Sequence, residues 1–168
     1  MKMKTGLAAL VTALLLLPGI AQADELPMKA EAPITLTSPS AILCEASTGQ
    51  VIFEKNADER RPVASVNKVM TILLTLEAVD EGRVSLEDQV TVSPRAASMG
   101  GSQAFLDAGE RYKLSELLKT VIVASANDSA VALAEHLAGT EESFVRLMNT
   151  RAEELGLTNT HYANCTGL

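Results

Sequence analysis

The apolar residues come in blocks whose spacing predicts one β-hairpin followed by several helices. Residues 41–46 and 51–55 are short β-prone runs on either side of Ser47-Thr48-Gly49-Gln50. Two such runs joined by a short polar, glycine-containing segment are typical of a hairpin. We therefore expect the ordered part of the chain to open with two antiparallel strands.

The next block, residues 66–79, carries apolar side chains on nearly every helical face. That distribution predicts a helix that is buried all round. Pro62 prevents an earlier start, and Gly82 provides a stop. We expect the helix to begin at or just after Ser65 and to run for about four turns.

Further along, residues 89–92 are β-prone and residues 98–102 form a glycine-serine loop. Three helical stretches follow, at residues 114–124, 129–137 and 141–155. Thr140 is the expected N-cap of the last of these helices, and Gly156 follows its end. A hairpin, a buried helix and then a helical region indicate an α+β fold.

The first 23 residues have the organisation of a secretory signal peptide. Lys2 and Lys4 precede an apolar run, which ends in Ala21-Gln22-Ala23. A membrane anchor is the alternative, but the apolar run is short for a bilayer span. We expect an exported protein with a flexible leader at residues 24–33 and a single domain from residue 34 to residue 168.

Charge and cysteine content exclude some classes of function. The formal net charge is -7, and loss of the predicted signal peptide, which holds two lysines and no acid, makes it -9. Nucleic acid is therefore not an expected partner. Cys44 and Cys165 are too few for a disulfide scaffold, but they could form one bridge; equally, they could be a buried strand thiol and a loop thiol.

Ser65 and Lys68, at the predicted start of the apolar helix, are the first candidate catalytic residues. Residues three apart share a helix face, which places the lysine amine beside the serine hydroxyl. A lysine whose pKa is lowered by burial can take the proton from a serine nucleophile. The alternative is an N-cap serine followed by a lysine that extends to solvent.

Ser125 and Asn127 form a second candidate group, in a polar break between two predicted helices. Residues of these types also cap helix ends, and together with Asp128 they could do only that here. The S-x-N pattern alone is weak, since Ser65-Val66-Asn67 matches it as well.

Several stretches together resemble the low-molecular-weight penicillin-binding proteins, the serine-type D-alanyl-D-alanine carboxypeptidases of the β-lactamase and transpeptidase superfamily. The resemblance covers residues 34–168. The matching motifs are Ser65-Val66-Asn67-Lys68, with asparagine where threonine is usual, Gly101-Ser102-Gln103-Ala104-Phe105-Leu106, Ser125-Ala126-Asn127 and Asn164-Cys165-Thr166-Gly167-Leu168.

The resemblance implies a role for each candidate. Ser65 would be the acylated nucleophile, Lys68 its proton acceptor, Ser125 the relay to the leaving D-alanine, and Asn127 a substrate-binding residue. The substrate would be a peptidoglycan stem peptide ending in D-Ala-D-Ala, and β-lactams would acylate the same serine. No cofactor or metal is implied, and we interpret His136 and His161 as ordinary surface or packing residues.

The third motif of the family, K-T-G on a late strand, has no match downstream of Ser125. No C-terminal membrane anchor is recognisable in these residues either. We therefore expect an N-terminal portion of the catalytic domain that is inactive by itself. The alternatives are a non-catalytic, wall-associated binding fragment and a class A β-lactamase, for which Glu154-Leu155-Gly156-Leu157-Thr158 is a poor match to E-x-x-L-N.

The signal-peptide hypothesis predicts cleavage after Ala23, so that Asp24 becomes the N-terminus of the exported protein. N-terminal sequencing of the secreted material measures this directly. An exported protein that retains Met1 would contradict the hypothesis.

Overall fold

The computed structural model describes residues 35–168. The predicted signal peptide and the leader lie outside the described residues. The chain divides between Lys55 and Asn56 into two compact units, and each is described by itself.

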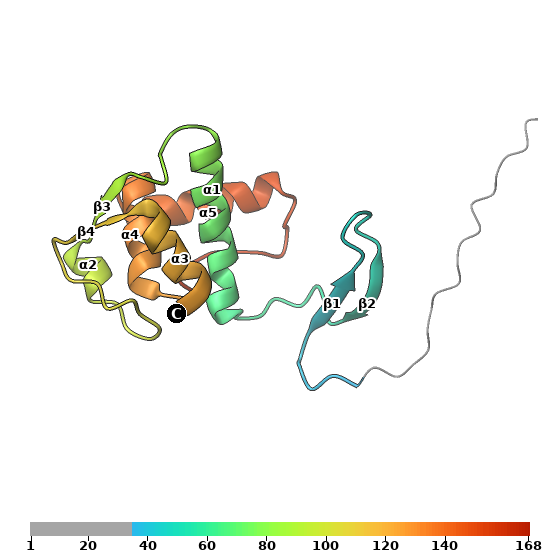
Figure 1. Ribbon diagram of the computed structural model, residues 1–168. Coiled ribbons are helices and arrows are strands. Elements are labelled where there is room, and N and C mark those ends of the chain that lie inside the picture. The colour runs from blue at the N-terminus through green and yellow to red at the C-terminus, as the bar shows by residue number, and fades with distance from the viewer. Residues whose placement is uncertain (1–34) are drawn as a thin grey trace, which may run out of the picture. The chain divides into compact units, whose positions relative to one another are not determined.

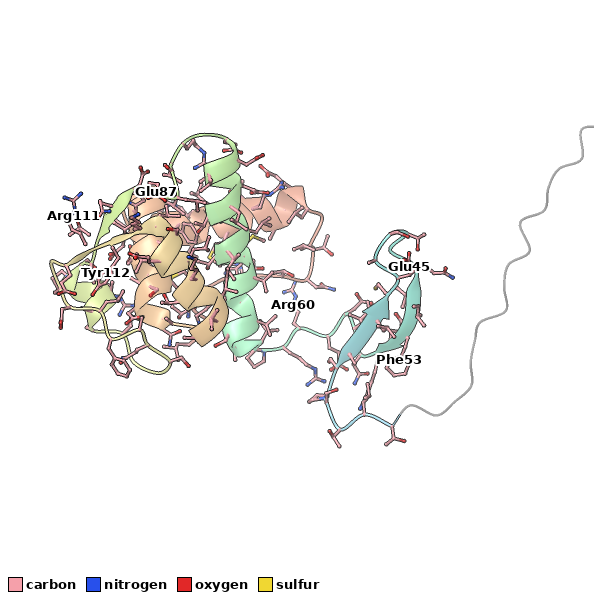
Figure 2. All side chains as sticks on the ribbon, in the orientation of Figure 1. Glu45, Phe53, Arg60, Glu87, Arg111 and Tyr112 are labelled. Carbon is pink, nitrogen blue, oxygen red and sulfur yellow. The ribbon has the colours of Figure 1, made fainter. Side chains whose placement is uncertain are left out.

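The first unit contains the predicted hairpin. Strands β1 (Ala41–Cys44) and β2 (Val51–Lys55) pair antiparallel, with Ala41 opposite Lys55. At the turn, the Glu45 carboxylate accepts hydrogen bonds from the backbone and hydroxyl groups of Ser47 and Thr48, which lower its pKa to about 2. Figure 2 labels Glu45 at this turn and Phe53 on β2. A side chain that satisfies the turn in this way explains why a short polar tetrapeptide can connect the strands.

The second unit contains five helices, two strands and a short 3₁₀ turn, and the other helices lie around helix α4 (Figure 1). The elements are the 3₁₀ turn η1 (Ala64–Asn67), α1 (Lys68–Asp80), β3 (Gln89–Thr91), α2 (Pro94–Ala97), β4 (Arg111–Lys113), α3 (Leu114–Ala124), α4 (Asn127–Ala138) and α5 (Glu141–Glu154). Helix α4 packs against α1, α2, α3, α5 and β3. All eight of its first residues, 127–134, are buried.

Most of the predicted elements are confirmed, and their differences have local causes. Helix α3 has the predicted bounds, and the Thr140 hydroxyl caps α5 by accepting a hydrogen bond from the Ser143 N–H at 3.1 Å. Helix α4 begins two residues earlier than predicted, because residues 127 and 128 turn into the helix and not into a loop. Strand β4, which was not predicted, pairs with β3; it has only three residues, too few to show a periodicity.

The prediction that the 66–79 helix is buried all round is wrong. Val66, Val69 and Leu76 are exposed, at 67%, 64% and 46% of their surface, whereas Met70 and Ala78 are buried. The exposed side chains recur at intervals of three and seven residues and so form one apolar stripe along η1 and α1. Because apolar residues occur all around this segment, its sequence could not distinguish the exposed face from the face against α3 and α4.

Neither cysteine forms a disulfide in the described part of the chain. The alternative prediction is wrong in one respect, since the strand residue Cys44 is exposed and not buried. Cys165 does lie in a loop, where it is fully buried. Among residues 35–168, no helix has the length and apolar character that a bilayer crossing requires.

The core of the second unit predicts unequal effects for two phenylalanines. Phe144 on α5 is fully buried against this core, while Phe105 is 82% exposed. Phe144→Ala should lower the free energy of unfolding by about 3–5 kcal/mol, because it removes a large buried side chain and leaves a cavity. Phe105→Ala, the matched control, should change it by less than about 0.5 kcal/mol in chemical denaturation. Equal losses for the two variants would contradict this assignment of the core.

Candidate active site

Ser65 and Lys68 lie on consecutive turns at the start of the long helix, Ser65 in η1 and Lys68 as the first residue of α1. The Lys68 Nζ lies 3.3 Å from the Ser65 Oγ. The Ser65 residue is exposed, whereas only 2% of the Lys68 surface is accessible. A capping serine and a solvent-directed lysine are therefore excluded: Lys68 is buried, and neither helix start has a side-chain cap.

The surroundings of Lys68 favour its neutral form. Burial lowers the pKa of the Lys68 amine, and negative charge on Cys165 would oppose this effect. Burial, together with the neighbouring Glu141 carboxylate, raises the pKa of the Cys165 thiol far above its usual range, which keeps that thiol neutral. The opposing charge is thus absent at ordinary pH, and the lowering by burial prevails.

The turn at residues 164–168 supplies the second hydrogen-bond partner of Lys68. The Lys68 Nζ donates to the Thr166 carbonyl oxygen at 2.8 Å. The Asn164 side chain closes the turn, because its Oδ1 accepts hydrogen bonds from the backbone N–H groups of Thr166 and Gly167 at 3.1 and 2.6 Å. Gly167 has φ +83° and lies so close to the Ala64 carbonyl that a Cβ atom would overlap it. The close approach explains the glycine at this position.

Two residues next to the candidate chemistry have left-handed backbone conformations. Ala64, which precedes Ser65, has φ +47°, and Ser125 has φ +56° at the C-terminal end of α3. Such conformations are unfavourable for residues with a Cβ and persist only where the surrounding structure enforces them. The Ala64 carbonyl lies directly against the backbone of Gly167.

Asn127 begins α4 but does not cap it. Its side-chain Nδ2 donates to the Gly100 carbonyl oxygen at 2.7 Å, and its backbone N–H donates to the Ser102 carbonyl oxygen at 2.7 Å. Its Oδ1 is buried and, within residues 35–168, has no hydrogen-bond partner. A buried acceptor without a partner is costly, so this oxygen is available to a further hydrogen-bond donor. The Ser125 hydroxyl, which is half-buried, is likewise without a hydrogen bond in the described part.

Asp128 is a structural residue of the site that the sequence analysis treated only as a possible cap. Its buried carboxylate accepts hydrogen bonds from the backbone N–H groups of Ala104 and Leu106, at 3.0 and 3.2 Å. It therefore fixes the loop that follows the glycine-serine segment. Its position directly after the S-x-N pattern was the available signal, but nothing in the sequence indicated a partner more than 20 residues away.

The turn at residues 164–168 also connects the two candidate groups. Gly167 packs against Ala64 and the Asn67 side chain. The next residue, Leu168, lies beside Gly101, and a Cβ at Gly101 would come within 2.8 Å of the Asn127 amide. The turn thus lies between the Ser65–Lys68 pair and the loop that holds Asn127, although no direct hydrogen bond joins those two groups in the described residues.

The remaining candidates lie away from this arrangement. Glu154, which the β-lactamase alternative would use as a base, is largely exposed and pairs with Arg151 at 3.0 Å on α5. That ion pair borders a groove between α1 and α5 that contains neither Ser65 nor Lys68. His136 lies 4.0 Å from Asp88, and His161 is exposed.

Comparisons with known proteins agree with this geometry. The sequence profile of the peptidase S11 family, described as D-alanyl-D-alanine carboxypeptidase, matches residues 27–168. D-alanyl-D-alanine carboxypeptidase DacF of Bacillus subtilis is 51% identical over 129 residues, which are 77% of this chain and 33% of the relative. DacC of Escherichia coli is 39% identical over 145 residues, 80% of this chain and 36% of the relative.

Solved structures of the same class share the fold. The D-alanyl-D-alanine carboxypeptidase DacD of Francisella tularensis aligns with a TM-score of 0.79 at 38% identity, over 80% of this chain and 33% of that one. Penicillin-binding protein 5 of Haemophilus influenzae aligns with a TM-score of 0.78 at 33% identity, over 81% of this chain and 40% of that one. The predicted fold class is confirmed as the N-terminal region of a β-lactamase/transpeptidase-like fold. The chain spans about a third of the length of the curated relatives it matches, and it belongs to the D-alanyl-D-alanine carboxypeptidase family, peptidase S11.

Proposed function

We propose that this chain carries the nucleophile half of a serine-type D-Ala-D-Ala carboxypeptidase site. The observation that carries the proposal is the position of the buried Lys68 amine. It lies 3.3 Å from the hydroxyl of the exposed residue Ser65 and donates a hydrogen bond to the Thr166 carbonyl oxygen. A serine hydroxyl reacts slowly until a base removes its proton, and a lysine is a base only when neutral. Burial lowers the pKa of the Lys68 amine and so favours its neutral form.

In the proposed reaction, Lys68 takes the Ser65 proton and the alkoxide attacks the carbonyl carbon of the D-Ala-D-Ala peptide bond. The developing oxyanion accepts a hydrogen bond from the Ser65 backbone N–H. When the C–N bond breaks, the Ser125 hydroxyl gives its proton to the departing D-alanine nitrogen and takes one from the protonated Lys68 amine, which becomes neutral again. Water then hydrolyses the Ser65 ester, which releases the shortened stem peptide and restores the serine.

Asn127 is proposed to bind the substrate. Its Oδ1 is a buried acceptor without a partner in the described residues, so it suits a donor such as a substrate backbone N–H or the Lys68 amine. The two hydrogen bonds from Asn127 to the Gly100 and Ser102 carbonyls hold this acceptor in place.

The peptidoglycan substrate places the proposed reaction outside the cytoplasm, in agreement with the signal-peptide hypothesis. β-Lactams are proposed as covalent inhibitors because they present a strained amide to the same serine. No K-T-G triplet follows Ser125 in these 168 residues. The family resemblance implies that a strand carrying this triplet supplies a second oxyanion donor. Loss of one such donor costs about 3–4 kcal/mol of transition-state stabilisation.

The proposal predicts that a fluorescent penicillin labels Ser65 in the intact protein, by which we mean a protein in which downstream sequence supplies the K-T-G motif. Ser65→Ala should abolish the label, and Lys68→Ala should slow labelling by about two to four orders of magnitude, because it removes the base. Gel fluorescence over time gives the rate. Ser47→Ala and Lys119→Ala change exposed residues outside the site and are the matched controls. Covalent label on the Ser65→Ala protein would place the nucleophile elsewhere.

A second prediction concerns the segment of residues 24–168 alone. With one oxyanion donor and no K-T-G strand, it should label at least about a hundredfold more slowly than a protein in which downstream sequence supplies that motif. Stopped-flow labelling of the two proteins compares them. Labelling of the segment at the full rate would show that Ser65 and Lys68 need no third motif. Binding of the stem peptide without any labelling of either protein would favour the wall-binding alternative.

A further inference from the structure

Asn67, one of the two residues between the candidate nucleophile and the candidate base, has a side chain in an unusual place. It occupies the N-cap position of α1, where asparagine ordinarily accepts a hydrogen bond from its own helix. No such cap is formed. The Asn67 Nδ2 donates instead to the Asn164 carbonyl oxygen at 2.9 Å, across 97 residues of sequence. Asn67 is nearly buried, at 9% exposure.

This bond is one of three between the start of the long helix and the turn at residues 164–168. Three side chains within five residues of the helix donate to three consecutive carbonyl oxygens of the turn. The pairs are Asn67 with Asn164 at 2.9 Å, Thr71 with Cys165 at 2.8 Å, and Lys68 with Thr166 at 2.8 Å. Only the third of these involves the candidate base, and the other two fix the backbone that accepts from it.

From this geometry we propose that Asn67 is a positioning residue for Lys68, acting through the turn at residues 164–168. The proposal rests on the proposed function of Lys68 as the base for Ser65. The Asn67 Cβ packs under Gly167, where a Cβ on the glycine would come within 2.9 Å. Asn67 therefore holds the turn at both of its ends, and the Thr166 carbonyl lies between them.

The functional consequence is that the Lys68 amine keeps its position opposite Ser65 and stays shielded from water. When the turn is released, the Thr166 carbonyl no longer holds the amine opposite Ser65, and water reaches the amine. The titratable group that faces Lys68 is the Cys165 thiol from the turn, with Glu141 of α5 behind it. The thiol remains neutral, so burial is the effect that sets the pKa of the Lys68 amine. Access of water to the site therefore raises this pKa back toward the usual value of a lysine.

The test substitutes Asn67 and follows Lys68 directly. Asn67→Leu keeps the size of the side chain and removes its donor, and Asn67→Ala removes the same donor without bulk should the first variant fold poorly. NMR titration of lysine labelled with ¹³C at Cε, with Lys68 assigned by Lys68→Arg, should show its midpoint rising by about one pH unit in either variant. Penicillin labelling of Ser65 at neutral pH should slow by about tenfold.

Asn149 offers a matched control of the same chemistry. Its side chain donates to the Tyr162 carbonyl and accepts from the Tyr162 N–H, both at 2.9 Å, and so it also ties down the C-terminal segment, four residues before Thr166. Asn149→Leu should lower the melting temperature and leave the Lys68 midpoint unchanged.

An unchanged Lys68 midpoint in both Asn67 variants would overturn the inference, as would an equal shift in Asn149→Leu. The titration does not depend on acylation, so the two proposals fail separately. Shifted midpoints in a protein that penicillin never labels would contradict the proposed function and leave the positioning role of Asn67 in place.

Discussion

The structure of the site depends on one buried interaction, the Lys68 amine between the Ser65 hydroxyl and the Thr166 carbonyl. Burial of a lysine costs free energy unless its nitrogen has hydrogen-bond partners and its surroundings favour the neutral form. Both conditions come from one short turn, which offers a carbonyl oxygen and surrounds the amine with neutral groups. The start of the long helix and residues almost one hundred positions away are therefore a single structural unit.

Unfavourable backbone conformations gather around this interaction. Ala64 is left-handed beside Ser65, Ser125 is left-handed between two helices, and Gly167 can approach Ala64 only because it lacks a side chain. Polar contacts fix other parts of the backbone nearby. Asn164 closes its own turn, and Asp128 fixes the loop at residues 104–106. Asn127 and Asp128 are the first residues of helix α4, whose first eight residues are all buried. The packing of α4 in the core therefore fixes the positions of these two side chains.

Sequence periodicity predicted the parts of this architecture that depend on local chemistry. The hairpin, helix α3 and the Thr140 cap of α5 are all determined by residues close together in the chain, and all are confirmed. Strand β4, its pairing with β3 and the exposed stripe on α1 were missed, because each depends on which distant segment lies alongside. In the candidate site, the spacing of Ser65 and Lys68 predicted their contact. The Thr166 carbonyl and the Asn67 bond could not be predicted, since backbone acceptors leave no signature in side-chain types.

The central claim, that the buried amine of Lys68 activates Ser65, is tested most directly by the pH dependence of Ser65 acylation by a β-lactam in the intact protein. A base acts in its neutral form, whose population rises with pH through its pKa. Burial lowers the pKa of Lys68 from its usual 10.5. The account predicts an acylation rate that rises with pH to a plateau, with a midpoint clearly below that value and absent in Lys68→Ala. A midpoint at the ordinary lysine value, or a limb that persists unchanged in Lys68→Ala, would contradict it.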